Sequence, residues 1–217
     1  MKAALISDTH GMLPDPKKFE KVDFILHAGD IGPDWYKGKR GIFPWYKDEF
    51  SEWARAIGKP IHMTWGNHDF IGERADHSIW EELLPENVHI HVDEQVEIEG
   101  KKVWFSPWSP TFGNWAWMCS ENDLATKYIN IPADTQIIVS HSPPHMYGDF
   151  TCYDKLHVGS GELLMIMKNL PNLKLVVCGH IHEARGIYKD DKVEIRNVSL
   201  VNEIYDMIHE PDIIDWD

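Results

Sequence analysis

The sequence predicts an α/β domain of the α+β type, built on mixed β-sheets. Five short apolar runs are bounded by Gly, Pro or polar residues, which is typical of buried strands. Helix-like segments lie between several of these runs, and two other segments alternate like β-hairpins. Alternating strands and helices with inserted hairpins indicate mixed sheets covered by helices.

The five predicted strands end in polar clusters rather than in ordinary turns. Each strand and its cluster reads, in order, 2–7 ("KAALIS", then "DTHG"), 23–28 ("DFILHA", then "GD"), 60–65 ("PIHMTW", then "GNHD"), 135–140 ("TQIIVS", then "HSPP") and 173–178 ("LKLVVC", then "GHIHE"). Ligands of α/β sheets bind at the carboxyl ends of strands. We therefore expect these clusters, which lie far apart in the chain, to meet on one rim.

Helices are predicted from the spacing of apolar residues and from their end signals. Gly58 stops the first helix, Ser160 is the expected cap of the last, and Ser120 with Asp123 resembles a capping box. Alternating patterns around a Gly-Lys turn and around "KDD" predict hairpins. The helices are expected over 46–57, 120–128 and 160–170, and the hairpins over 87–106 and 184–200.

Length and composition are those of an ordinary globular protein. The chain of 217 residues is expected to form one domain, 1–217, with 43% hydrophobic and 26% charged residues. The apolar run near the start has about five residues, too few for a signal sequence or a membrane span. We therefore expect a soluble, cytoplasmic protein. The three cysteines show no CxxC spacing and are expected to be reduced.

The charge balance limits the class of partner. A formal net charge of −14 disfavours extended nucleic acid and a membrane surface as partners, because both bind clustered Lys and Arg. A small phosphate ester stays compatible, since bound metal inverts the charge locally. The sequence does not indicate an oligomeric state.

The five polar clusters together suit metal-dependent chemistry. Carboxylates, imidazoles and one amide, without a thiolate, suit Mn²⁺, Fe, Zn²⁺ or Ni²⁺ better than Ca²⁺ or Cu⁺. A catalytic zinc keeps about three protein ligands, so a larger set favours two metals that share a carboxylate. The set is Asp8, His10, Asp30, Asn67, His68, Asp69, His141, His180 and His182.

In this order, "DTH", "GD", "GNHD", "HSPP" and "GHIH" resemble the motifs of the calcineurin-like metallophosphoesterases. The resemblance implies a four-layer αββα sandwich of two mixed sheets flanked by helices, with the metal site at the strand C-terminal rim. It implies a catalytic His68, as proton donor to the leaving oxygen or as a stabiliser of its charge, and Asp69 as the residue that orients His68. The implied ligands are Asp8, His10 and His182 for metal one, and Asp30, Asn67, His141 and His180 for metal two, with Asp30 bridging.

Four further stretches are similar to a small subgroup of metallophosphoesterase-domain proteins that is associated with hydrolysis of phosphodiesters, cyclic nucleotides included. They are "HAGD" at 27–30, "SPWSP" at 106–110, "HVGSGELL" at 157–164 and "GHIHEARG" at 179–186. Two features depart from that subgroup: Asp69 stands where a glutamate is usual, and the insertion 35–50 has no counterpart. Both differences bear on which substrate is preferred, and neither changes a predicted metal ligand.

The resemblance therefore implies a dinuclear metal-dependent phosphodiesterase that acts on small substrates, cyclic nucleotides among them. Metal-activated hydroxide would attack the phosphorus while His68 assists the leaving group. The alternatives are a phosphomonoesterase or protein phosphatase, and a non-catalytic metal-site protein that binds nucleotide or protein partners.

Three other residues are candidates for substrate binding. His145 directly follows "HSPP". Trp108 opens an aromatic stretch with Trp115 and Trp117 that could stack a base or simply cover the edge of the sheet. Asn197 lies in an "N-x-S" stretch that is similar to one in the subgroup.

Overall fold

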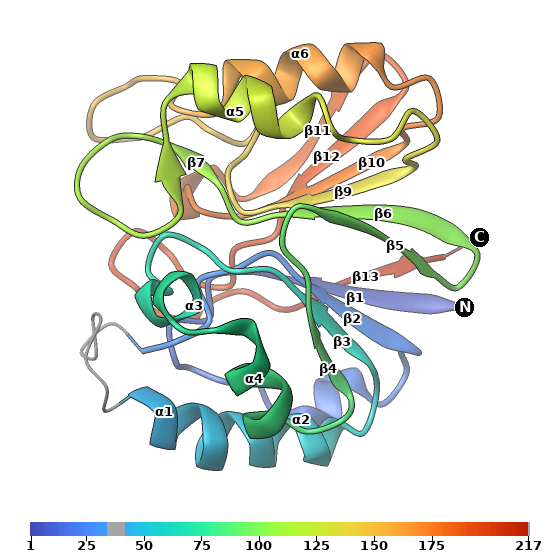
Figure 1. Ribbon diagram of the computed structural model, residues 1–217, viewed down its shortest axis with the longest axis vertical. Coiled ribbons are helices and arrows are strands. Elements are labelled where there is room, and N and C mark those ends of the chain that lie inside the picture. The colour runs from blue at the N-terminus through green and yellow to red at the C-terminus, as the bar shows by residue number, and fades with distance from the viewer. Residues whose placement is uncertain (34–41, 217) are drawn as a thin grey trace.

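The computed structural model describes residues 1–33 and 42–216 of the chain. It has four layers, in which two β-sheets pack face to face and helices cover their outer faces (Figure 1). The expected four-layer αββα sandwich of two mixed sheets is confirmed.

The first sheet has the strand order β13-β1-β2-β3-β4. β1 to β4 are parallel, and β13 lies antiparallel beside β1 at the sheet's edge. The strands are β1 (Lys2–Ile6), β2 (Phe24–His27), β3 (Ile61–Met63), β4 (Val88–Ile90) and β13 (Asp212–Asp215).

The second sheet has the order β11-β12-β10-β9-β6-β5, with β12, β10, β9 and β6 parallel and the outer two strands antiparallel. β7 (Ser109–Pro110) pairs separately with β8 (Met118–Cys119). The strands of the large sheet are β5 (Glu94–Ile98), β6 (Lys101–Ser106), β9 (Ile137–Ser140), β10 (Leu175–Cys178), β11 (Gly186–Asp190) and β12 (Val193–Asn197). The five strands predicted before the polar clusters are thus confirmed as β1, β2, β3, β9 and β10.

The predicted helices are confirmed, with one extension. Ser120 accepts a hydrogen bond from the Asp123 N–H at 3.2 Å and Ser160 from the Leu163 N–H at 3.1 Å, as their caps require. The helix expected over 46–57 begins earlier, as α1 (Ile42–Trp45) and a π-helical turn η3 (Tyr46–Phe50) that lead into α2 (Ser51–Ile57). The rest of the insertion, 35–41, lies outside the described residues. The other helices are η1 (Pro16–Phe19), α3 (Phe70–Arg74), α4 (His77–Leu83), α5 (Glu121–Tyr128), α6 (Gly161–Asn169) and η4 (His182–Ala184).

Successive residues of the central strands supply different cores, because side chains alternate across a strand. In β1, Ala4 and Ile6 pack under the helices of the first sheet, whereas Leu5 packs between the two sheets. In β10, Val177 packs between the sheets and Val176 packs against the side of α5 and α6. Burial on both faces explains why these strands are continuous apolar runs.

The expected hairpin over 87–106 is wrong in its first part. β5 and β6 do form the hairpin, around Gly100 with a φ of +78°, which suits glycine. Residues 88–90 instead form β4, which pairs in parallel with β3 in the other sheet, with Ile61 opposite Val88. The alternating pattern looks the same for either partner, and only the non-local pairing decides between them.

None of the described helices is long and apolar enough to cross a membrane. Cys119, Cys152 and Cys178 are free thiols, as expected.

Candidate metal centre

The predicted site residues follow the carboxyl ends of parallel strands in both sheets. Asp8 and His10 follow β1, Asp30 follows β2, and Asn67 follows β3 in the first sheet. His141 follows β9, and His180 and His182 follow β10 in the second. The structure brings these residues together into two adjoining groups, which we call the metal groups. The first group is Asp8, His10 and His182, and the second is Asp30, His141 and His180.

Four of these residues have a backbone conformation that side chains rarely adopt. Their φ angles are +52° for Asp8, +44° for His10, +54° for Asp30 and +69° for His180. Hydrogen bonds across the site hold them there: the Asp8 N–H donates to the Gly29 carbonyl at 2.9 Å and the His180 N–H donates to the Asp8 carboxylate at 3.1 Å. Such local strain, held by surrounding structure, is typical of functional sites.

In the first group, the ring nitrogens of two imidazoles face one another and a carboxylate. His182 donates its Nδ1–H to the Asn202 carbonyl at 3.1 Å, which turns its Nε2 toward the group. That Nε2 lies 3.3 Å from the His10 Nε2 and 3.5 Å from an Asp8 oxygen. Two ring nitrogens and a carboxylate oxygen thus converge on one point, an arrangement that suits a cation.

The second group has the same design. His141 donates its Nδ1–H to the Ala28 carbonyl at 2.9 Å. Its Nε2 then faces the Asn67 Oδ1 at 2.8 Å and the Asp30 Oδ2 at 3.4 Å. Asp30 Oδ2 also lies 3.8 Å from the His10 Nε2 of the first group. Asp30 is therefore between the two groups, where the motifs predicted a bridging ligand.

The electrostatics fit a pair of divalent cations. Burial alone would lower the pKa of His141, but the Asp30 carboxylate raises it to about 9, so this imidazole holds a proton where a cation fits. Burial lowers the pKa of His180 to about 3, which leaves it neutral and able to ligate. Despite its burial, the pKa of Asp30 lies well below its ordinary value because of the surrounding imidazoles, His141 foremost. The N and O donors suit borderline divalent metals.

Two motif glycines give these ligands room. A Cβ on Gly66 would overlap the Asp30 carboxylate and the His141 ring, and one on Gly179 would overlap the Asp8 carboxylate. The glycines of "GNHD" and "GHIHE" are thus required by close approach to the site.

His68 lies at the mouth of the site. Its ring stacks on Trp115 with centroids 4.4 Å apart and meets the His10 ring edge-on at 4.8 Å. Its backbone N–H donates to Asp30 Oδ1 at 2.8 Å, which couples its position to the predicted bridging ligand. The imidazole lines the cavity that also holds Asp30, His180 and His182 in its lining.

The Asp69 carboxylate bonds to groups of two loops and of a helical turn. Its buried carboxylate accepts hydrogen bonds from the N–H groups of Gly66 at 2.9 Å and of Ile31 and Gly32 at 3.1 Å, and from the Tyr46 hydroxyl at 3.3 Å. It therefore ties the loop after β2 to the loop after β3. The hydrogen bonds described for its carboxylate go to those four donors, so Asp69 stabilises the backbone of the loop that carries His68.

The three expected substrate contacts do not line the cavity among the described residues. Asn197 is buried, and its side-chain amide donates to the carbonyls of Gly148, Gly179 and Ile181, so it holds the loop that carries His180 and His182. Trp108 donates its indole N–H to Asp93 at 2.7 Å. The His145 imidazole lies 3.6 Å from Asp149.

The cavity has a volume of about 550 Å³ and an aromatic wall that the sequence only partly indicated. Trp115, in the aromatic stretch noted above, lines it together with Phe112, Tyr153 and Tyr205. Tyr205 meets the rings of His10 at 4.7 Å and His182 at 5.0 Å. Its segment follows β12, far from every motif, and nothing in its pattern pointed to the site.

Comparison with known proteins gives matches along most of the chain. A family model described as calcineurin-like phosphoesterase matches residues 1–184. Metallophosphoesterase domain-containing protein 1 of Homo sapiens is 27% identical over 233 residues, which cover 97% of this chain and 69% of that protein. A UPF0046 protein of Caenorhabditis elegans is 32% identical over 135 residues, covering 62% of this chain and 34% of that protein. A crystal structure of a dimetal phosphatase from Danio rerio has a similar fold, with a TM-score of 0.54 at 11% identity over 94% of this chain and 88% of that one.

Proposed function

Since this chain belongs to the calcineurin-like phosphoesterase family and is accordingly a metal-dependent phosphoesterase, we propose that it hydrolyses phosphodiester bonds of small, base-bearing substrates, cyclic nucleotides among them. One observation favours diesters. The described residues that line the cavity include Asp154, Glu183 and Glu203 but no Lys or Arg. A diester carries one negative charge and a monoester nearly two, so this acidic rim repels the monoester more strongly.

The aromatic wall supports a substrate that carries a base. Trp115, Phe112, Tyr153 and Tyr205 offer ring faces beside the metal groups. Stacking of one base on an aromatic side chain contributes about 1–3 kcal/mol. The same acidic rim disfavours a long polyanion, so we propose a small molecule as partner rather than nucleic acid or a membrane surface.

Each group of residues has a part in this reaction. Two divalent cations held by the two groups would supply Lewis-acid activation of water and neutralise charge on the phosphate oxygens. Asp30 would hold the pair at a fixed spacing, with His180 in one group and His182 in the other. His68 would donate a proton to the leaving oxygen, an assistance that contributes roughly 10²–10⁴-fold. Asp69 and Asn197 would keep the loops that carry these ligands in place.

A panel assay tests this function. Bis-p-nitrophenyl phosphate, p-nitrophenyl phosphate and 2′,3′- and 3′,5′-cyclic AMP are supplied to protein loaded with Mn²⁺, Fe²⁺, Zn²⁺ or Ni²⁺. We expect diesters to exceed the monoester in kcat/KM, and His68→Ala to keep its metal while losing turnover. Equal activity of metal-stripped protein contradicts metal dependence. Higher activity on the monoester indicates a phosphomonoesterase, and nucleotide binding without turnover indicates a binding protein.

A further inference from the structure

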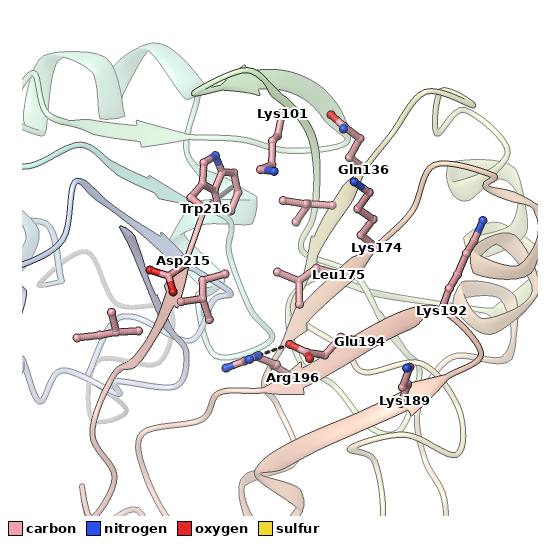
Figure 2. Close-up of a pocket in the computed structure, with 13 residues that line it drawn as sticks. Lys101, Gln136, Lys174, Leu175, Lys189, Lys192, Glu194, Arg196, Asp215 and Trp216 are labelled. Atoms are coloured by element: carbon pink, nitrogen blue, oxygen red, sulfur yellow. Dashed lines mark hydrogen bonds and ion pairs between the residues drawn. The ribbon is translucent and has the colours of Figure 1, made fainter. Parts of the chain in front are cut away.

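A second cavity lies at the opposite ends of the strands from the metal groups. It has a volume of about 580 Å³ and is lined by residues at the starts of β6, β9 and β10, by β12 and by β13 (Figure 2). β13 runs antiparallel to β1, with Asp215 opposite Lys2, so its end also lies at this rim. We call this cavity the basic groove, because its lining includes Lys101, Lys174, Lys189, Lys192 and Arg196.

The groove exists because the two sheets differ in width. Val193 and Ile195 of β12 pack against the side of α5 and α6, so Glu194 and Arg196 point to the opposite face, toward the first sheet. The first sheet ends at β13. Figure 2 shows Asp215 and Trp216 on one side of the groove and Lys174, Glu194 and Arg196 on the other.

The charge of the groove is opposite to that of the chain. Its lining holds five basic residues and two acidic ones, in a protein of formal net charge −14. Glu194 is paired with Arg196 at 2.6 Å, which leaves the four lysines of the lining against Asp215. Lys174 and Lys189 are exposed, and neither makes a side-chain hydrogen bond or ion pair within the described part of the chain. The groove therefore attracts anionic groups.

The edge of β13 faces the groove. Ile213, Ile214, Asp215 and Trp216 are consecutive residues, and all four line it. Since neighbouring side chains point to opposite faces of a strand, contact with all four requires contact with the strand's edge. β13 has one strand neighbour, β1, in the described residues, so that edge offers unpaired backbone donors and acceptors. The side chain of Ile213 there is 47% exposed.

We propose that the basic groove binds an extended segment of a partner protein, which adds to the first sheet beside β13. Alternate side chains of the added strand would face the second sheet, where Lys174 and Lys189 lie, and these positions suit Asp or Glu. The other positions would lie beside Ile213 and suit Val or Ile. β13 already makes one such contact, since its Asp212 lies 3.5 Å from the Arg196 guanidinium. Main-chain pairing supplies affinity in this mode and the side-chain alternation supplies specificity.

The strand edge distinguishes this partner from other anions. A small phosphate would use the lysines alone and leave the exposed isoleucine and the backbone edge without a role. A second copy of the chain has the same net charge of −14 and a basic groove of its own. Two basic grooves repel each other, and so do two acidic molecules, so a second copy does not suit this site. An acidic, apolar strand uses the charge, the edge and the isoleucine together.

The test uses the full chain and an eight-residue peptide in which Glu alternates with Val. Fluorescence anisotropy measures its affinity beside two control peptides, one of the same composition with all Glu before all Val, and one in which Lys replaces Glu. We expect the alternating acidic peptide to bind best, with new hydrogen-exchange protection at residues 212–215. The double variant Lys174→Glu with Lys189→Glu should weaken binding about tenfold, because two attractions become repulsions. Lys47→Glu, an exposed lysine outside the groove, is the matched control and should change the affinity less than about twofold.

Other outcomes overturn the proposal. Equal affinity of the alternating and block peptides would show a site for any anion rather than for a strand. Displacement of the peptide by inorganic phosphate at the concentration of the peptide itself would show the same. Binding that is unchanged in the double variant would place the peptide elsewhere. Absence of binding at millimolar peptide would exclude the groove as a strand-binding site.

Discussion

Replacement of Asp69 by Asn separates its observed structural role from the role expected in orienting His68. The carboxylate is fully buried, and both of its oxygens accept hydrogen bonds. Oδ2 accepts from the Gly66 N–H, whereas Oδ1 accepts from Ile31 and Gly32. An amide retains only one acceptor oxygen, so its NH₂ group must face a backbone N–H on one side or the other.

The magnitude follows from these contacts. At least one buried N–H loses its acceptor, at a cost of about 1–3 kcal/mol, and the remaining bonds lose their charge assistance. We expect the free energy of unfolding to fall by about 3 kcal/mol. In a chain of this length that lowers Tm by roughly 6–12 °C.

Urea unfolding of metal-free protein at pH 8 measures the effect. Burial, with the nearby Asp30 charge, raises the pKa of Asp69 to about 6, so at pH 8 the wild-type carboxylate is ionised. Tyr46→Phe is the control, because it removes one donor at 3.3 Å and leaves the three backbone bonds. It should cost no more than about 1.5 kcal/mol. An Asn variant with wild-type stability and a displaced pH–rate profile would refute the reasoning and restore the direct role on His68.

Three more predictions concern the metal groups and the aromatic wall. His180→Ala and His182→Ala should each lose one metal and retain the other, because the two imidazoles belong to different groups. Inductively coupled plasma mass spectrometry counts the bound metals. Loss of both metals in either variant would contradict this division. In metal-free protein the raised pKa of His141 contributes stability that is fully present below pH 6.5 and is lost as pH rises through about 9. Bound metal displaces that proton, so the loss of stability with rising pH should be absent from unfolding midpoints measured with Mn²⁺. Calorimetry should also detect release of a proton when the metal binds. A loss of stability that persists with metal would argue against His141 as a ligand. Trp115→Leu should raise KM for cyclic AMP by roughly 5–100-fold but not for the cyclic phosphate of ribose without its base. Trp108→Leu, which changes a tryptophan outside the cavity lining, should leave both KM values unchanged.

Much of the site was predictable because its residues follow strands that are recognisable locally. β1, β2, β9 and β10 are buried on both faces, so each is a mainly apolar run that ends abruptly in polar residues, and β3 buries Ile61 and Met63 on one face. Parallel strands in one sheet present their carboxyl ends at one edge, which brings such residues together. That pattern was sufficient to expect Asp8, Asp30 and His141 in one place.

The partners of Asp69 were not predictable in the same way. Ile31, Gly32 and Gly66 use their backbone N–H groups, and a backbone group carries no mark in the sequence. The Tyr46 hydroxyl reaches the carboxylate from a helical segment that packs beneath the sheet. Proximity in the motif suggested His68 as the partner, whereas the hydrogen bonds described for the carboxylate go to backbone amides of both loops and to Tyr46.

By itself the sequence determined the strands, the helix caps and the chemistry of the metal groups, because these depend on residue type and on spacing along the chain. The tertiary structure decided which strands became neighbours. It therefore decided that β4 pairs with β3 in the first sheet rather than in the expected hairpin. It also decided that Tyr205 faces the metal groups and that an acidic chain has a basic groove beside β13. Both results depend on how two sheets of different width stack over a shared core. That stacking is a balance of burial over the whole molecule and is not recorded in any one segment.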